Sequence, residues 1–276
     1  MSFGPTDGHI CDEASQPKEY AMPKIDEHPV GNPCWIELFT SDTDKARAFY
    51  GELFGWTAEE MGPDYGNYIN LHLGGRREAG LMHNDGSQGA PETWNVYLAT
   101  ADVQTALDAA ASNGGQVLMP AMDVMDLGRM GMVADPGGAA IGLWQAKEFM
   151  GLGVLDEPGA PSWFELHTRE FDKSVDFYRK VFAWDTHEVG DTDEFRYTTL
   201  GKDDNAKAGI MDASQWIPAG EPAKWSIYFA TKSVDDSLKK VEQLGGKITT
   251  AAEDTPYGRL AEAADPTGVR FKLRQT

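Results

Sequence analysis

A tandem repeat constrains this sequence more than any other feature. Each half of the chain opens with a Trp-x-Glu strand pattern, continues through Phe-Tyr and a later Trp, and ends near an Asp-Pro-x-Gly turn. The matched landmarks, first half before second, are Trp35 and Trp163, Glu37 and Glu165, Phe49 and Phe177, Trp56 and Trp184, and Asp135 and Asp265. Because their spacing stays at roughly 130 residues, the chain predicts one supersecondary plan laid down twice.

The repeat divides the 276 residues into two modules of similar length. We assign residues 29–146 to module 1 and residues 162–276 to module 2, and we expect the Gly- and Pro-rich segment 147–161 to be a linker. Residues 1–28 lack hydrophobic periodicity, so we expect a mobile or partly ordered arm. Each module is long enough to bury a modest core.

Within each module, some segments space their apolar residues as a helix does and others alternate them as a strand does. Ala46, Phe49, Tyr50 and Leu53 have helical spacing and predict a helix that lays one apolar stripe on a sheet. Alternating segments bounded by turn residues predict the strands that follow each helix. The pattern therefore predicts two strand-helix-strand-strand-strand units in each module, and such modules have an α+β fold.

Composition excludes several classes of partner. The net charge of −20 and a pI near 4.6 surround the protein with a negative field that repels phosphate backbones and anionic lipid. No apolar run approaches the roughly 20 residues that a membrane span needs, and no leader pattern is found at the start. Two cysteines cannot form a disulfide framework. We expect a cytoplasmic protein that binds neither nucleic acid nor membrane.

The repeated motifs resemble the vicinal oxygen chelate superfamily, which includes glyoxalase I, bleomycin-resistance proteins and extradiol dioxygenases. Phe-Tyr and Phe-Gly-Trp after the first strand, and Asp-Pro-x-Gly before the last, carry the resemblance over roughly residues 30–276. The Gly-Arg and Gly-Leu-Trp-Gln ending is more narrowly similar to two-module actinobacterial proteins catalogued as a 27 kDa antigen or as hydroxylases. The resemblance implies that each module forms a curved mixed sheet around a cavity.

The resemblance also implies three metal-ligand positions in each module, which metal-using members fill with His, Gln or Glu. The corresponding residues here are Trp35, Asn95 and Gly142 in module 1, and Trp163, Ser226 and Lys272 in module 2. None is a good ligand for a divalent ion, so we expect no metal and no cofactor. A register slip of two residues would bring Glu37 or Glu165 into the first position.

Strand alternation directs one set of side chains in each module towards the implied cavity. The candidate catalytic residues are Glu165, His167 and Glu37, and the candidate ligand-binding residues are Trp35, Asn95, Tyr97, Trp144, Trp163, Ser226, Tyr228, Lys272 and Arg274. A carboxylate on a concave apolar wall loses hydration, so its pKa rises and it becomes suited to acid–base work near neutral pH. In the alternative interpretation, each Glu only pairs with an arginine such as Arg129 or Arg259.

A cluster of methionines in module 1 has two interpretations. Its members are Met119, Met122, Met125, Met130 and Met132. Methionine can form an adaptable lining for an apolar ligand, but it more often fills gaps in a core. We favour the core interpretation.

Three functions remain open. Aromatic cavity positions without metal ligands favour a protein that binds a small planar or aromatic molecule. The first alternative is a metal-independent isomerase, lyase or hydrolase that uses a cavity Glu as acid or base. The second is a metal-dependent glyoxalase or dioxygenase with an atypical ligand set. We expect a small-molecule ligand and a monomer or weak homodimer, because a tandem chain can build internally what single modules build by dimerising.

Overall fold

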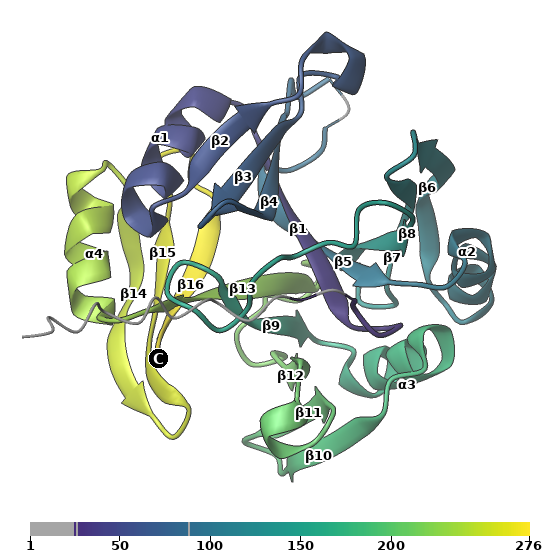
Figure 1. Ribbon diagram of the computed structural model, residues 1–276. Coiled ribbons are helices and arrows are strands. Elements are labelled where there is room, and N and C mark those ends of the chain that lie inside the picture. The colour runs from purple at the N-terminus through teal and green to yellow at the C-terminus, as the bar shows by residue number, and fades with distance from the viewer. Residues whose placement is uncertain (1–24, 26, 88) are drawn as a thin grey trace, which may run out of the picture.

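The computed structural model describes residue 25, residues 27–87 and residues 89–276. These residues form two eight-stranded sheets, one in each module, and four α-helices (Figure 1). The predicted arm at 1–28 lies almost wholly outside the described residues. No helix in the described part of the chain is long and apolar enough to cross a bilayer.

Module 1 contains two units of the predicted kind. The first consists of β1 (Pro33–Thr40), α1 (Thr43–Phe54), β2 (Thr57–Glu60), the 3-10 turn η1 (Pro63–Tyr65), β3 (Ile69–Leu73) and β4 (Arg76–His83). The second consists of β5 (Thr93–Ala99), α2 (Val103–Ser112), β6 (Gln116–Val124), β7 (Gly128–Ala134) and β8 (Ala140–Ala146).

Module 2 repeats this order. Its first unit consists of β9 (Pro161–Thr168), α3 (Phe171–Phe182), β10 (Thr186–Asp191), β11 (Arg196–Leu200), the 3-10 turn η2 (Asp203–Asn205) and β12 (Ala208–Asp212). Its second consists of β13 (Lys224–Thr231), α4 (Val234–Gln243), β14 (Lys247–Thr255), β15 (Gly258–Ala264) and β16 (Arg270–Gln275).

The strand order is the same in both sheets. It is β2-β3-β4-β1-β5-β8-β7-β6 in module 1 and β10-β11-β12-β9-β13-β16-β15-β14 in module 2. The first strand of each unit pairs in parallel with the last, as β1 does with β4, whereas β1 and β5 pair in antiparallel fashion at the centre. The predicted α+β fold with two β-α-β-β-β units per module is therefore confirmed.

Capping residues explain where α1 begins and ends, and a matching left-handed residue ends α3. The side chain of Asp42 accepts a hydrogen bond from the backbone amide of Lys45 at 2.9 Å and caps α1. Gly55 then ends α1 with a left-handed φ of 76°. Ala183 has the matching position after α3 and is forced to a φ of 55°. A residue with a Cβ is strained in this region, so module 2 carries a small backbone penalty.

Replacing Ala183 with glycine is expected to raise the free energy of unfolding by about 1 kcal/mol, because the strain disappears. The matched change Gly55→Ala is expected to lower it by a similar amount. A Cβ added at Gly55 meets no atom within 4 Å, so only backbone strain can act there. Urea titrations of both variants test this pair, and an unchanged midpoint in both would contradict it.

The two modules pack through the helix-bearing faces of their sheets. In Figure 1, α1 lies beside α4 and α2 lies beside α3, and contacts between the paired helices accompany contacts between β5 and β13. The hydroxyl of Tyr50 donates to Oδ2 of Asp265 at 3.0 Å, and that of Tyr178 donates to Oδ2 of Asp135 at 3.3 Å. The two bonds join equivalent residues in opposite directions, which indicates that an approximate two-fold axis relates the modules.

The apolar stripe of α1 therefore reaches further than predicted. Besides its own sheet it contacts module 2, where the ring centroid of Phe54 lies 4.9 Å from Phe229 and that of Phe49 lies 6.0 Å from Phe271. The motifs that carry the family resemblance thus form the interface between the modules. Because strand residues alternate in direction, Trp35 and Glu37 point to the opposite, concave face of the sheet.

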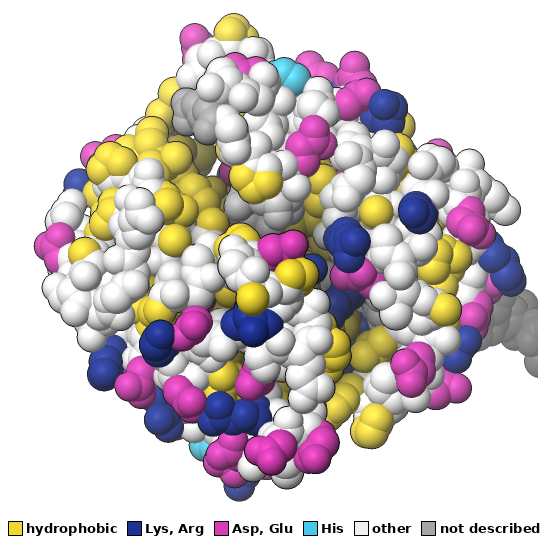
Figure 2. Space-filling view, turned by 180° about the vertical axis from the view of Figure 1, so that it is seen from behind, with side chains coloured by type: hydrophobic (Ala, Val, Ile, Leu, Met, Phe, Trp, Pro, Cys, Tyr) yellow, Lys and Arg dark blue, Asp and Glu magenta, His cyan; other side chains and the backbone are white. Residues whose placement is uncertain are grey.

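Figure 2 shows charged side chains of both signs on one face of the molecule. On the face shown in Figure 2, acidic side chains lie interspersed with lysines and arginines. The acidic excess expected from the sequence is therefore spread out on this face.

Candidate binding and active site

Cross-strand register gathers the predicted residues of module 2 on one concave face. Glu165 lies opposite Ser226, and Tyr228 lies opposite both Trp163 on β9 and Lys272 on β16. Directly opposed residues on neighbouring strands share a face of the sheet. The equivalent set in module 1 consists of Glu37, Asn95, Tyr97, Trp35 and Gly142. The structure thus groups the predicted residues into two similar sites, one in each module.

The carboxylate of Glu165 is the centre of a buried polar network in module 2. Its Oε1 accepts hydrogen bonds from the Tyr228 hydroxyl at 2.8 Å and from Lys272 Nζ at 3.3 Å, and lies 2.6 Å from His167 Nε2. Its Oε2 accepts a hydrogen bond from the Tyr197 hydroxyl at 2.8 Å. A buried carboxylate with this many donors is well satisfied.

This network reverses the direction predicted for the pKa of Glu165. Burial is the largest single influence and would raise the pKa, but the hydrogen bond from His167, the positive charge of Lys272 and the Tyr228 hydroxyl together lower it to about 2. Glu165 is therefore anionic at neutral pH and a weak base. Burial and the charge of Glu165 raise the pKa of Tyr197 and Tyr228, which keeps both hydroxyls protonated as donors.

Lys272 and His167 are the polar members of this network that solvent reaches. Their side chains are 18% and 13% exposed, whereas that of Glu165 is 6% exposed. Lys272 Nζ lies 2.8 Å from the Tyr228 oxygen and 3.2 Å from His167 Nε2. His167 Nε2 cannot both donate to Glu165 and accept from Lys272, so the position of its proton selects one of the two bonds.

The site of module 1 has no counterpart of either His167 or Lys272. Phe39 and Gly142 occupy the positions that correspond to His167 and Lys272. A Cβ added at Gly142 would lie 2.2 Å from the ring of Tyr97, so no side chain fits there. Glu37 accepts a hydrogen bond from the Tyr97 hydroxyl at 3.2 Å. Burial raises the pKa of Glu37 although hydrogen bonds from tyrosines oppose this, so here the predicted direction is found.

A linker residue covers two of the predicted ligand-binding residues of module 1. The ring of Phe149 lies 4.7 Å from Trp35 and 5.7 Å from Trp144 between ring centroids, and the guanidinium of Arg77 lies 5.1 Å from its centroid. The Trp144 indole also donates to the Phe149 carbonyl at 2.8 Å. Trp35 and Trp144 thus already hold an aromatic ring of the same chain.

The arginine partner considered for Glu165 is wrong. Arg259 forms ion pairs with Asp235 at 2.9 Å and with Asp254 at 3.0 Å. The cation beside Glu165 is Lys272, which reaches it across the concave face. The prediction failed because the Gly-Arg motif lies on β15 at the outer end of the sheet, close to helix α4.

Two tyrosines of the sites were missed from the sequence. Tyr197 donates to Glu165, and its oxygen accepts from the Trp163 indole at 2.9 Å, while Tyr68 accepts from the Trp35 indole at 3.1 Å in module 1. Both tyrosines stack over a glycine on the neighbouring strand, where an added Cβ would lie 2.0 Å or less from the hydroxyl oxygen. The repeat could have revealed them, because Tyr68 and Tyr197 recur at the same spacing as the other landmarks.

The methionines of module 1 are not buried inside the core, although Met130 packs against its edge. Met130 and Met132 are half-buried on β7 opposite Trp144 and Gly142, so they lie on the concave face. Met122 is 48% exposed. The concave face of module 1 is therefore largely apolar, whereas that of module 2 is charged.

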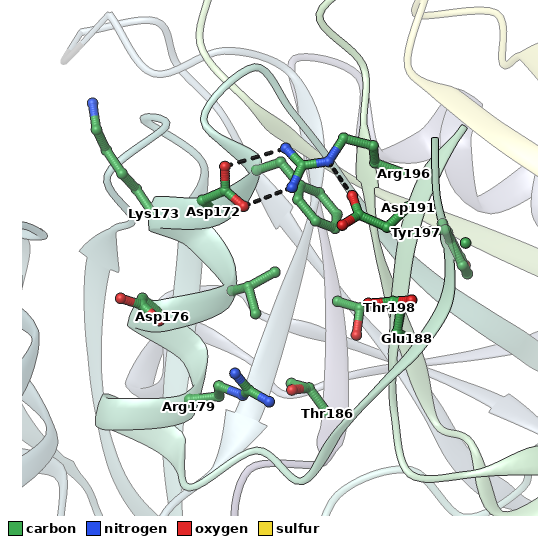
Figure 3. A pocket seen from close by; sticks show the side chains of 13 residues that line it. Asp172, Lys173, Asp176, Arg179, Thr186, Glu188, Asp191, Arg196, Tyr197 and Thr198 are labelled. Carbon is green, nitrogen blue, oxygen red and sulfur yellow. Dashed lines mark hydrogen bonds and ion pairs between the residues drawn. The ribbon is translucent and has the colours of Figure 1, made fainter. Parts of the chain in front are cut away.

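A separate cleft of about 360 Å³ lies between α3 and the strands β10 and β11 (Figure 3). Arg196 at this cleft binds Asp172 at 2.7 Å and Asp191 at 2.6 Å, as the dashed lines in Figure 3 show. The two aspartates of these ion pairs are exposed to solvent, and their charges neutralise that of Arg196. Tyr197 lines this cleft and also donates to Glu165, but Glu165, His167 and Lys272 are not among the lining residues. We therefore place the candidate site on the concave face of module 2.

The donors present do not fit a divalent metal. The ammonium group of Lys272 lies 3.3 Å from Glu165 Oε1 and would repel a dication beside that carboxylate. In module 1, Gly142 offers no donor atom. Within the described residues, no three His, Cys, Asp or Glu side chains come together in a metal-binding group. We therefore derive no step through a metal.

Comparison with known proteins identifies the family of this chain. A family model described as the Glyoxalase/Bleomycin resistance protein/Dioxygenase superfamily matches residues 34–143 and 161–273. The chain belongs to this superfamily. It is 35% identical over 257 residues to "Putative glyoxylase CFP32" from Mycobacterium tuberculosis, covering 91% of this chain and 97% of that protein. It is 31% identical over 260 residues to the anthracycline biosynthesis protein DnrV from Streptomyces peucetius, covering 88% and 92%.

Solved structures of the glyoxalase/dioxygenase superfamily share the fold. The Mn(II)-bound glyoxalase from Novosphingobium aromaticivorans matches with a TM-score of 0.62 at 17% identity, over 90% of this chain and 82% of that one. The 2,3-dioxygenase LapB from Pseudomonas sp. KL28 matches with a TM-score of 0.61 at 16% identity, over 90% and 93%. The predicted family resemblance, including the narrower likeness to actinobacterial two-module proteins, is confirmed.

Proposed function

We propose that this superfamily member binds a small planar or aromatic molecule on the concave face of module 2. The network of Glu165, Lys272, His167 and Tyr228 supports this proposal, because its two cationic or titratable ends remain open to solvent. The equivalent aromatic face of module 1 is covered by Phe149. A few convergent polar groups beside aromatic walls are typical of small-molecule sites.

Lys272 is the group best placed to hold the ligand. Its contacts to Glu165 Oε1 and His167 Nε2, at 3.3 and 3.2 Å, are longer than the 2.7–2.9 Å usual for charge-assisted bonds. A carbonyl or phenolate oxygen can replace them at little cost while Lys272 keeps its 2.8 Å contact to Tyr228. The planar part of the ligand then lies towards Trp163.

A second candidate function is a metal-independent enzyme, and the position of His167 favours it. Its Nε2 lies 2.6 Å from Glu165, whose carboxylate would hold the ring in one orientation. In this scheme His167 accepts the proton from the ligand, and Lys272 stabilises the negative charge that develops on an oxygen. Glu165 positions His167 and does not itself take the proton.

Calorimetric titration of the purified protein with planar molecules that carry an acceptor oxygen tests the first function. Lys272→Met is expected to weaken binding at least tenfold, since a hydrogen bond to a charged group contributes about 1.5–3 kcal/mol. Tyr228→Phe is a second variant that keeps the cation. Glu37→Gln, in the covered site of module 1, is the control and should leave affinity unchanged.

The same preparation distinguishes the alternatives. Product formation that disappears in His167→Gln while binding persists would select the enzyme. One equivalent of divalent metal that survives dialysis, measured by elemental analysis, would overturn the proposal and select a metal-dependent glyoxalase or dioxygenase. Equal affinity in the wild type and in both variants of module 2 would place the ligand elsewhere.

A further inference from the structure

Because the modules are repeats, the position beside Trp35 in module 1 can be compared with the position beside Trp163 in module 2. In module 1, the ring of Phe149 packs between Trp35 on β1 and Trp144 on β8, at centroid distances of 4.7 and 5.7 Å. The corresponding residues of module 2 are Trp163 on β9 and Arg274 on β16. The way module 1 is filled therefore indicates what the same position of module 2 can hold.

In module 2 this position is a cavity. It has a volume of about 240 Å³, and its lining includes Trp163, Arg274, Lys207 and Leu155. The Trp163 indole donates to the Tyr197 hydroxyl, but among the described residues no aromatic ring packs against Trp163 as Phe149 packs against Trp35. A dry cavity of about 150 Å³ is enough to bind benzene, so this one has room for a ring with a substituent.

The cations of this cavity lack strong partners. The guanidinium of Arg274 makes one hydrogen bond, to the Ser162 carbonyl at 3.4 Å, and neither it nor Lys207 has an ion pair with any described residue. Asp156 and Asp203 also line the cavity. Neither forms an ion pair with these cations, although the charges of Arg274 and Lys207 act on the Asp156 carboxylate. A carboxylate of a ligand could thus bind Arg274 in the planar, bidentate manner that guanidinium groups favour.

We propose that this cavity binds an aromatic carboxylate. The ring packs against Trp163 at the place that Phe149 fills in module 1, and the carboxylate binds Arg274 with support from Lys207. The inference rests on the proposed function, since it names the ligand class of the same site. The cavity adjoins the Glu165 network on the same face of the sheet, because Trp163 and Lys272 both lie opposite Tyr228. In this proposal the ligand extends from Arg274 at the cavity towards Lys272 and His167.

Benzoate and its neutral analogue benzamide are suitable probes, and the indole N–H signal of Trp163 in ¹⁵N-resolved NMR spectra reports binding at this position. Trp163→Phe assigns that signal. Benzoate is expected to shift it saturably and to bind at least tenfold more tightly than benzamide. Arg274→Gln is expected to weaken benzoate binding at least tenfold, since a charged hydrogen bond is lost.

Two further variants sharpen the test. Arg274→Trp recreates the aromatic pair of module 1, so it should lose the preference for benzoate over benzamide. Arg259→Gln is the matched control, because Arg259 belongs to the same module but pairs with Asp235. This control should bind benzoate like the wild type.

The outcomes separate this inference from the function on which it rests. Benzoate binding that survives Arg274→Gln but is lost in Lys272→Met would overturn the carboxylate position and leave the proposed binding site on module 2 intact. A Trp163 signal that benzoate does not move would overturn the inference. Loss of binding in Arg274→Gln alone, with the Arg259→Gln control unchanged, would support it.

Discussion

Replacing Lys272 with methionine is expected to lower the free energy of unfolding at pH 7 by about 3 kcal/mol. Methionine preserves the length of the side chain but leaves the carboxylate of Glu165, whose side chain is 6% exposed, without its cation. Removing one partner of a buried ion pair typically costs 3–5 kcal/mol, because the remaining charge is uncompensated. Urea denaturation followed by circular dichroism measures the change.

The effect should depend on pH in a defined direction. Glu165 has a folded pKa of about 2, below its ordinary value of 4.5, so it contributes stability above pH 4.5 that is lost as the pH falls towards 2. Without Lys272 this pKa rises. The difference in unfolding free energy between the wild type and Lys272→Met should therefore narrow as the pH falls from 7 to 3. A difference that stays constant over this range would contradict the assigned network.

Matched variants identify the cause. The double change Lys272→Met with Glu165→Gln removes both charges, so it should recover part of the stability lost in the single variant. Glu37→Gln removes the corresponding carboxylate of module 1, which has no cation among the described residues. Its effect on stability should change with pH in the opposite direction, because the raised pKa of Glu37 makes the wild type lose stability as the pH rises, and the glutamine variant does not.

Replacing Phe229 with alanine is expected to lower the free energy of unfolding by about 3–5 kcal/mol, the usual range for a fully buried phenylalanine. Phe229 is 0% exposed and belongs to module 2, yet its ring lies 4.9 Å from Phe54 and 5.6 Å from Trp94 of module 1. The cavity left by this change therefore weakens both modules. Guanidinium denaturation monitored by circular dichroism and by tryptophan fluorescence measures the loss.

The same experiment tests whether the modules unfold as one unit. Because the interface is continuous with both cores, we expect coincident transitions by both probes in the wild type and in Phe229→Ala. Phe149→Ala is the control, since Phe149 is only half-buried at the linker and should cost less. Two separate transitions in the wild type would show that the modules are independent.

Local patterns were sufficient to predict the fold. Strand and helix periods, the Asp42 cap and the repeated turns are properties of neighbouring residues, so each unit could be placed from its own sequence. Alternation along β1 and β9 likewise placed Glu37 with Trp35 and Glu165 with Trp163 on one face, and the family resemblance implied that this face is concave. The repeat then strengthened every assignment, because each element had a second copy at the same spacing.

The sequence could not predict which segment each buried surface packs against. The stripe of α1 was assigned to a sheet, but Phe49 and Phe54 also pack against module 2. Periodicity shows that a face is buried and does not show what buries it. The same limit applies to the methionines, which proved to lie half-exposed beside Trp144.

The sequence by itself determined two modules, the order of the elements within each unit, and which side chains share a face of the sheet. It also placed Phe39 and Gly142 where module 2 has His167 and Lys272, but only the tertiary structure decided the consequences of these differences. Phe149 covers Trp35 in module 1, while Lys272 lowers the pKa of Glu165 to about 2 in module 2. Both effects depend on distances between segments far apart in the chain, and a pKa or a covered ring follows from those distances rather than from local pattern.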